Sequence, residues 1–269
     1  MRLTDGECWR CTRSPDGPVT LHLTVAAGAL EAEAWGPGAA WAVEHVPGLV
    51  GLDDDAGGFR PHHPVVRELR RRHPGLRLLR TGAVAEALFP SVLEQKVVGL
   101  EARRSYQWLV RRVGEAAPGA GGLTLPPSPA ALAATPTWVF HQAGVERRRA
   151  DTVRRAMTRA VRLEETVSMP VADAYRRLRA FSGVGAWTAA EVASVALGDP
   201  DAVSLGDYHL PGIVSWALAG EPGGDDDRLL ELLEPYRGHR ARVVRLLETG
   251  GVGHPRRGPR LELRPISSW

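Results

Sequence analysis

The sequence predicts a mainly α-helical protein with a small N-terminal α+β domain built on an antiparallel sheet. Two stretches near the N-terminus, 19–25 and 30–35, alternate apolar with polar residues, which is typical of half-buried strands. From Val84 onward helical patterns with short breaks replace this alternation. The chain of 269 residues is 43% hydrophobic and 24% charged, a globular composition that excludes disorder along its whole length.

Residues 1–82 form the expected N-terminal domain. The turn Ala27-Gly28-Ala29 joins the two alternating stretches into an antiparallel pair. Proline and glycine delimit the remaining elements. These are a short helix 39–46 stopped by Pro47-Gly48, a loop 53–58, and an arginine-rich helix 63–72 with Pro64 in its first turn.

Cys8 and Cys11 are the two cysteines of the chain. Two cysteines cannot build a disulfide framework or a four-cysteine zinc site. Their C-x-x-C spacing suits redox chemistry, but no βαβ pattern surrounds it. We therefore interpret them as two small residues on an N-terminal strand.

Residues 83–252 form the expected helical domain, followed by a basic surface tail over 253–269. Pro90 is expected to open a long helix that continues to Val113, and Gly- and Pro-rich residues 116–129 to form a loop. The remaining expected helices start at Ser128-Pro129 and at Pro136, and then span 145–163, 171–181, 186–197, 208–218 and 225–247, the last broken near Pro235.

The charge of the chain is small but its cations are uneven. Its 34 basic and 31 acidic residues give a net charge of +3, and Lys96 is the sole lysine. Arginine suits bidentate phosphate contacts, although a G+C-rich genome produces the same bias. No apolar run is long enough to span a membrane and the N-terminus lacks a signal-peptide core, so we expect a cytoplasmic protein.

One turn between two helices has the pattern of an anion site. In Phe181-Ser182-Gly183-Val184-Gly185-Ala186 two glycines flank one apolar residue. The turn is expected to be too tight for side chains at either glycine, with Val184 tucked between the helices. Backbone N–H groups at the start of the second helix would then face outward, toward a DNA phosphate. The alternative is an ordinary helix–turn–helix corner in which the glycines only end the first helix and permit the turn.

Asp207 follows Gly185 by 22 residues and lies at the expected start of another helix. Aspartate is a favoured N-cap, which is a sufficient structural reason for its presence. The same position favours the charged carboxylate, because backbone N–H groups and the helix dipole stabilise an anion. Such a carboxylate beside a phosphate-binding turn could stabilise a cationic sugar transition state.

The hairpin and the downstream aspartate together resemble the helix-hairpin-helix (HhH-GPD) superfamily of DNA base-excision glycosylases, most of all the 3-methyladenine DNA glycosylase II (AlkA) type. The resemblance covers roughly 84–250, and the N-terminal strands look like the TATA-binding-protein-like domain of that type. It implies that Asp207 is the catalytic carboxylate. Trp187 takes the place of the Schiff-base lysine of bifunctional members, which implies a monofunctional enzyme.

The resemblance also implies the residues that line the site. The candidate base pocket comprises Trp187, Glu191 and Tyr208. Trp187 would stack on the extruded base or, equally, pin the hairpin as a core residue. The candidate DNA contacts are Gln95, Lys96, Gly183, Val184, Gly185, Thr188 and Arg240. Any cofactor is expected to be absent, apart from a possible monovalent cation at hairpin carbonyls when DNA is bound.

Four positions depart from the family pattern. Ser182 stands where proline is usual, and Lys96 stands at the wedge position, where an apolar side chain is usual. Glu191 replaces an aromatic pocket residue, and Glu248 falls near another on the last helix. If both carboxylates face the pocket, it is more acidic than expected. The alternative for Lys96, Glu191 and Glu248 is a solvated helix surface.

The resemblance thus implies a monomeric glycosylase that flips and excises alkylated purines from damaged double-stranded DNA. Three alternatives stay open. The enzyme could act on other damaged purines, the chain could be a non-catalytic DNA-binding protein, or Lys96 could supply lyase chemistry. The preferred lesion and the role of the N-terminal domain are not specified by the sequence.

Overall fold

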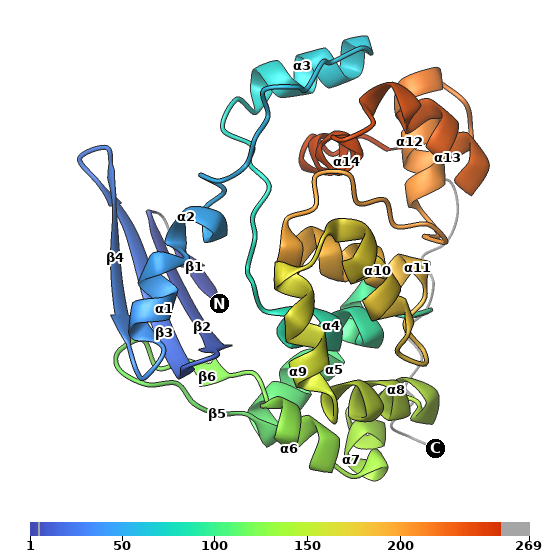
Figure 1. The fold of residues 1–269 in the computed structure, drawn as a ribbon. Coiled ribbons are helices and arrows are strands. Elements are labelled where there is room, and N and C mark those ends of the chain that lie inside the picture. Colours follow the sequence, from blue (N-terminus) through green and yellow to red (C-terminus); the bar gives the residue numbers. More distant parts are fainter. Residues whose placement is uncertain (5, 254–269) are drawn as a thin grey trace.

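The computed structural model describes residues 1–4 and 6–253, which form an N-terminal antiparallel sheet followed by a set of helices (Figure 1). The sheet has the strand order β1-β2-β3-β4. Val25 pairs with Leu30 across the turn, which confirms the predicted antiparallel pair, and the two cysteines lie on β2. The strands are β1 Arg2–Thr4, β2 Glu7–Ser14, β3 Gly17–Ala26 and β4 Ala29–Trp35.

One face of this sheet builds the first of three hydrophobic cores. Leu21 and Leu23 pack against α1 Ala39–Glu44 and α2 Val46–Leu49, and we call this cluster the sheet core. The expected stop at Pro47-Gly48 is wrong, because both residues lie inside α2. Proline is compatible with the first turn of a helix, where its missing N–H has no intrahelical partner anyway.

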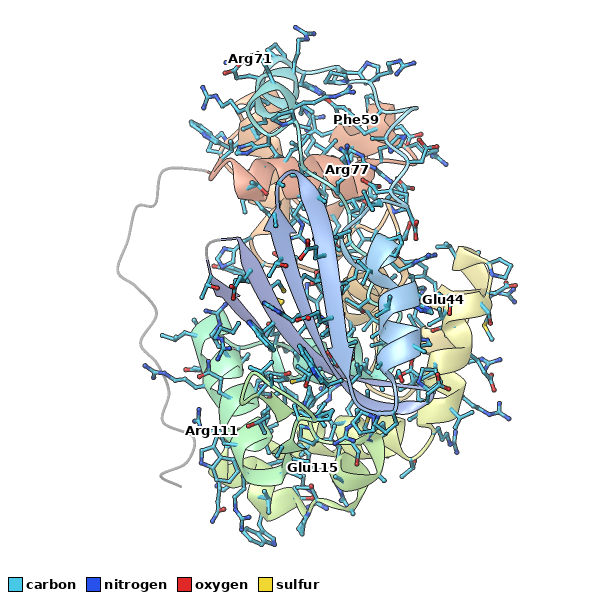
Figure 2. All side chains as sticks on the ribbon, turned by 90° about the vertical axis from the view of Figure 1, so that its left-hand side faces the viewer. Glu44, Phe59, Arg71, Arg77, Arg111 and Glu115 are labelled. Carbon is cyan, nitrogen blue, oxygen red and sulfur yellow. The ribbon has the colours of Figure 1, made fainter. Side chains whose placement is uncertain are left out.

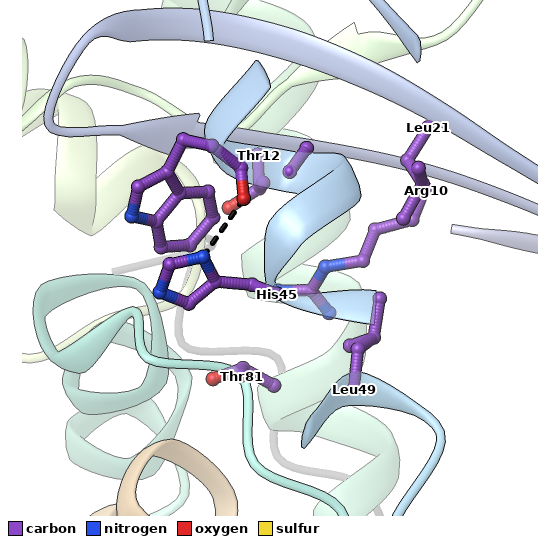
Figure 3. Close-up of a pocket in the computed structure, with 8 residues that line it drawn as sticks. Arg10, Thr12, Leu21, His45, Leu49 and Thr81 are labelled. Atoms are coloured by element: carbon purple, nitrogen blue, oxygen red, sulfur yellow. Dashed lines mark hydrogen bonds between the residues drawn. The ribbon is translucent and has the colours of Figure 1, made fainter. Parts of the chain in front are cut away.

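A small cavity lies between the sheet and these two helices (Figure 3). Its volume is about 20 Å³, which is room for roughly one water molecule. Within it the His45 ring stacks on Trp41 and its Nδ1 lies 2.8 Å from the Trp41 carbonyl oxygen. The cavity is therefore too small for a nucleotide or a base.

The second and largest cluster, which we call the central core, is formed by helices from the middle of the chain. Leu88, Phe140, Val153 and Val184 are fully or almost fully buried in it. The short hairpin β5 Glu115–Ala116 and β6 Thr124–Leu125 interrupts the expected loop. The helices are α4 Val84–Leu93, α5 Gly99–Val113, α6 Pro129–Ala134, α7 Thr137–Gln142, α8 Arg147–Met157, α9 Ala160–Glu164, α10 Val171–Arg179 and α11 Ala186–Val192.

Two expectations about these helices are wrong. Pro90 lies inside α4, and the expected long helix is divided into α4 and α5 by a turn at 94–98. Within this turn Lys96 adopts a left-handed conformation, with φ of +56°. The expected single helix 145–163 is likewise divided at Thr158 and Arg159 into α8 and α9.

A third cluster, the C-terminal core, combines α3 Pro64–Arg72 with the last three helices. Phe59, Val66 and Leu69 pack there with Val214 and Leu246. Figure 2 shows Phe59 beside these helices and Arg71 on the outer side of α3. This core crosses the expected domain boundary at residue 82. The helices are α12 Leu210–Ala219, α13 Asp226–Leu233 and α14 Arg240–Thr249.

The remaining described segments are short. After α11 the chain continues as a π-helix, Ala193–Leu197, and two single-turn 3-10 helices lie at 165–168 and 234–236. Among the described residues no helix is long and apolar enough to cross a membrane. The predicted basic tail, apart from Gly253, lies outside the described residues.

Candidate active site

The turn Phe181–Ala186 joins α10 to α11 and uses its two glycines in different ways. Gly183 has φ of +94°, and a Cβ on it would lie 2.2 Å from the Thr152 hydroxyl oxygen of α8. Gly185 has an ordinary φ of −90°, and a Cβ there would meet nothing within 4 Å. Val184 is buried in the central core, as predicted. Lack of space for a side chain therefore explains why residue 183 is glycine. The expectation that Gly185 also has no room for a side chain is wrong.

Gly185 is exposed and directly precedes the first turn of α11, whose N–H groups have no intrahelical acceptor. No side chain caps this helix end. Because Gly185 has no side chain, a ligand can approach these N–H groups closely. The geometry suits an anion held by backbone amides, as a DNA phosphate would be.

Asp207 lies three residues before the first residue of α12 and is held by three donors. Its Oδ1 accepts from the backbone N–H groups of His209 at 2.7 Å and Leu210 at 2.8 Å. Its Oδ2 accepts from Trp187 Nε1 at 3.1 Å. A carboxylate has about four acceptor sites, so one remains for a further donor such as water.

This contact joins two of the cores. Trp187 lies on α11, whose Ala189 and Val192 belong to the central core. Asp207 precedes α12, whose Leu210 and Val214 belong to the C-terminal core. The candidate site therefore lies where these two cores meet, with the hairpin at one end of α11.

Glu191 lies one turn after Trp187 and reaches the same loop. The Ser204 hydroxyl donates a hydrogen bond to Glu191 Oε1. Burial raises the pKa of the Glu191 carboxyl, although the hydrogen bond from Ser204 opposes the rise. Negative charges nearby raise this pKa further, and they belong to Glu94, Glu248 and Asp207. Four carboxyl groups, those of Glu94, Glu191, Asp207 and Glu248, are thus close enough to interact.

The turn after α4 is attached to the hairpin through Gln95. Its Nε2 donates to the Gly183 carbonyl oxygen at 3.0 Å and to the Thr188 hydroxyl at 2.8 Å. Buried Arg149 holds the other side of the turn, donating from Nη1 to the Leu93 carbonyl oxygen at 2.5 Å. Lys96 is exposed and belongs to this turn, which Gln95 attaches to the hairpin and Arg149 attaches to α8.

Solved structures similar to this chain share its arrangement of sheet and helices. A 3-methyladenine DNA glycosylase from Archaeoglobus fulgidus is 20% identical, with a TM-score of 0.74 over 91% of this chain and 87% of that one. A Clostridium acetobutylicum 8-oxoguanine glycosylase/lyase, in complex with double-stranded DNA, is 15% identical, with a TM-score of 0.65 over 91% and 89%. The chain has the fold of a DNA glycosylase.

A third similar structure is the Schizosaccharomyces pombe 3-methyladenine DNA glycosylase in complex with abasic DNA. It is 15% identical, with a TM-score of 0.57 over 76% of this chain and 95% of that one. Neither a protein-family model nor a characterised protein matches the sequence. At these identities the likeness establishes the glycosylase fold, which confirms the predicted fold class.

Within this glycosylase fold, some of the predicted residues come together and others do not. Asp207, Trp187, Glu191, Gln95 and the hairpin form one connected set. Tyr208 is 87% exposed and its ring contacts His209 edge-on, so it does not enclose the site in this conformation. Arg240 binds Asp201 through two guanidinium nitrogens, and Thr188 is buried. The side chains of Arg240 and Thr188 therefore make contacts within the protein in this structure.

Three residues of the site were not found from the sequence. Ser204, Arg149 and Thr152 each make a contact with a residue far along the chain, and no local pattern distinguishes them from ordinary loop or helix residues. The described residues contain no group of three or more His, Cys, Asp or Glu side chains that could hold a metal ion.

Proposed function

We propose that this protein is a monofunctional DNA glycosylase that hydrolyses the N-glycosidic bond of alkylated purines in double-stranded DNA. One observation carries the proposal. Within a glycosylase fold, the Asp207 carboxylate accepts from Trp187, on the helix that begins at the glycine hairpin, and from the backbone N–H of Leu210 at the start of α12. The hairpin would hold the DNA backbone without reading its sequence.

The reaction needs an anion more than it needs an acid. A purine alkylated at N3 or N7 carries positive charge and leaves readily once it is flipped out of the duplex. Charge then grows on the sugar, and Asp207 would stabilise it electrostatically. The acceptor site that remains on Asp207 would orient the attacking water and take its proton as the C–O bond to the sugar forms and the C–N bond to the departing neutral base breaks.

The side chain at position 187 supports hydrolysis without strand cleavage. A lyase needs an amine, and Trp187 offers only an indole N–H, which donates to Asp207. Acidic residues around the site favour a cationic base over a neutral one. A monovalent cation at the hairpin carbonyls stays a prediction, and no step above depends on it.

A second candidate is a glycosylase for neutral damaged purines such as 8-oxoguanine. It is favoured by the likeness to the 8-oxoguanine glycosylase/lyase and by the Glu191 carboxyl, which could hydrogen-bond an uncharged base. Lys96, exposed beside the hairpin, would then be the amine of any lyase step.

The test is a panel of duplexes that each carry one lesion: 3-methyladenine, N7-methylguanine, hypoxanthine or 8-oxoguanine. Released free bases are identified by mass spectrometry under single-turnover conditions. We expect release of the methylated purines, and a loss of at least about 100-fold in Asp207→Asn with binding to an abasic duplex retained. Borohydride trapping should give no covalent adduct. Binding without release of any base by wild type would instead indicate a non-catalytic DNA-binding protein.

A further inference from the structure

Two side chains of α11 hold the loop that carries Asp207. Trp187 and Glu191 are one helical turn apart and therefore lie on the same face of the helix. Trp187 binds the Asp207 carboxylate, and Glu191 accepts a hydrogen bond from the Ser204 hydroxyl. The segment Ser204–Asp207 is thus attached to α11 at both of its ends.

Ser204 is in turn hydrogen-bonded to Asp207 through the backbone. The Asp207 backbone N–H donates to the Ser204 carbonyl oxygen at 3.2 Å, which closes a tight turn. Gly206, inside this turn, has φ of +85° and donates its N–H to Asp226 Oδ2 at 2.8 Å. Ser204 is therefore bound to α11 by its side chain and to Asp207 by its backbone.

We infer that Glu191 is a positioning residue that acts through Ser204 to fix the Asp207 carboxylate, rather than a wall of the base pocket. The inference rests on the proposed glycosylase function. Small errors in the placement of a reacting group cost rate steeply, because the near-attack geometry is lost. Trp187, the backbone N–H groups of His209 and Leu210 and the Gly206–Asp226 contact hold the Asp207 end of this segment, whereas the Glu191–Ser204 contact holds its other end.

The chemistry of the contact separates this role from others. The Ser204 hydroxyl needs only an oxygen acceptor, which a glutamine amide supplies as well as a carboxylate does. Glu191→Gln should therefore keep the attachment, and Glu191→Ala should remove it. Ser204→Ala should resemble Glu191→Ala, although residue 204 itself is not expected to touch the base.

The experiment measures single-turnover base release from a duplex with one N7-methylguanine, beside binding to an abasic duplex. We expect Glu191→Ala and Ser204→Ala each to slow release by about 10- to 100-fold with unchanged binding. The double variant should be no slower than the slower single variant, since one contact is lost in all three. Glu191→Gln should stay within about threefold of wild type because its amide oxygen still accepts. Glu231→Ala, on the exposed face of α13, is the matched control for loss of a carboxylate.

Hydrogen–deuterium exchange of residues 204–210 gives a readout that does not need catalysis. Exchange there should rise in Glu191→Ala and Ser204→Ala and stay at the wild-type level in Glu191→Gln. Wild-type exchange and rates in both alanine variants would overturn the inference, as would loss of activity in Glu191→Gln with Ser204→Ala fully active. If wild type releases no base from any lesion, the proposed function fails, and the exchange result alone upholds or overturns the attachment.

Discussion

Substitution by alanine should change the stability of the protein strongly at one glycine of the hairpin and hardly at the other. At Gly183 an added methyl group would collide with Thr152 and force a left-handed φ on alanine. We expect Gly183→Ala to cost about 2 kcal/mol or more of unfolding free energy. Gly185→Ala meets open space and should change stability by no more than about 0.5 kcal/mol. Chemical denaturation of the two variants measures both.

Affinity for DNA, unlike stability, should respond to the substitution at Gly185. A methyl group at position 185 stands at the exposed N–H groups of α11, so Gly185→Ala should weaken binding to an undamaged duplex by roughly tenfold, the worth of one hydrogen bond to a charged group. Fluorescence anisotropy at fixed salt measures this. Equal affinity of Gly185→Ala and wild type would contradict the assignment of the hairpin to phosphate binding.

At the scale of single residues, the sequence predicts the roles of those residues whose type limits their conformation or chemistry. Gly183, buried Val184 and Asp207 close to a helix start are of this kind and agree with the structure, whereas Gly185 has room for a side chain. Lys96 is not, because nothing in a lysine side chain favours a left-handed φ. That conformation depends on contacts made by Gln95 and Arg149 with distant residues, and such contacts leave no local trace.

At the scale of elements, the prediction of one helix from Pro90 to Val113 shows where local rules mislead. Proline is common in the first turn of a helix, and this preference favoured a start at Pro90. In the structure α4 begins six residues earlier, at Val84, whose N–H and that of Ala85 donate to the Glu164 carboxylate. A distant glutamate therefore sets the start of α4, and the helix accepts the loss of one hydrogen bond at Pro90.

The attachment of α14 to the loop 53–58 depends on a buried ion pair. Arg242 donates to both oxygens of Asp54 at 2.7 Å, and the side chains are 3% and 4% exposed. Burial acts to raise the pKa of Asp54, but hydrogen bonds from Arg242 and from the Leu78 N–H outweigh it. The pKa of Asp54 therefore lies below its ordinary value of 3.8.

A lowered aspartate pKa makes stability depend on pH in one direction. The contribution of Asp54 is fully present above its ordinary pKa and is lost as the pH falls through the lower pKa of the folded state. Denaturant midpoints from roughly pH 7 to pH 2 should therefore fall at the acid end. Arg242→Met alone should cost about 3–5 kcal/mol at neutral pH, because it leaves Asp54 buried without a partner.

The double variant Asp54→Leu and Arg242→Met is the matched control for this acid effect. It removes both charges together, so it should lose part of the acid dependence while keeping more stability at neutral pH than Arg242→Met. Asp201, whose pKa is lowered by Arg240, remains in this variant and leaves some acid dependence. An acid dependence identical to that of wild type would show that Asp54 does not contribute.

At the scale of the whole molecule, the three cores do not follow the order of the chain. The sheet core is local in sequence, and β3, β4 and the turn between them are predicted for that reason. The C-terminal core joins α3 to helices more than a hundred residues later, across the expected boundary at residue 82. Periodicity identifies α3 as a helix with an apolar face but does not say which distant helices that face meets.

This arrangement predicts where the chain can be divided. A chain that begins at residue 83 loses Phe59, Val66 and Leu69, all at most 3% exposed, from the C-terminal core. Each large side chain removed from a core costs about 2–5 kcal/mol, so the sum reaches the whole stability of an ordinary domain. A chain that begins at residue 52 keeps these residues, and it loses the sheet core together with the contacts of β2 with Glu86 and with the segment 115–126. We expect the longer chain to unfold cooperatively in near-ultraviolet circular dichroism and the shorter chain to lack a cooperative transition. Equal folding of the two chains would instead support a domain boundary at residue 82.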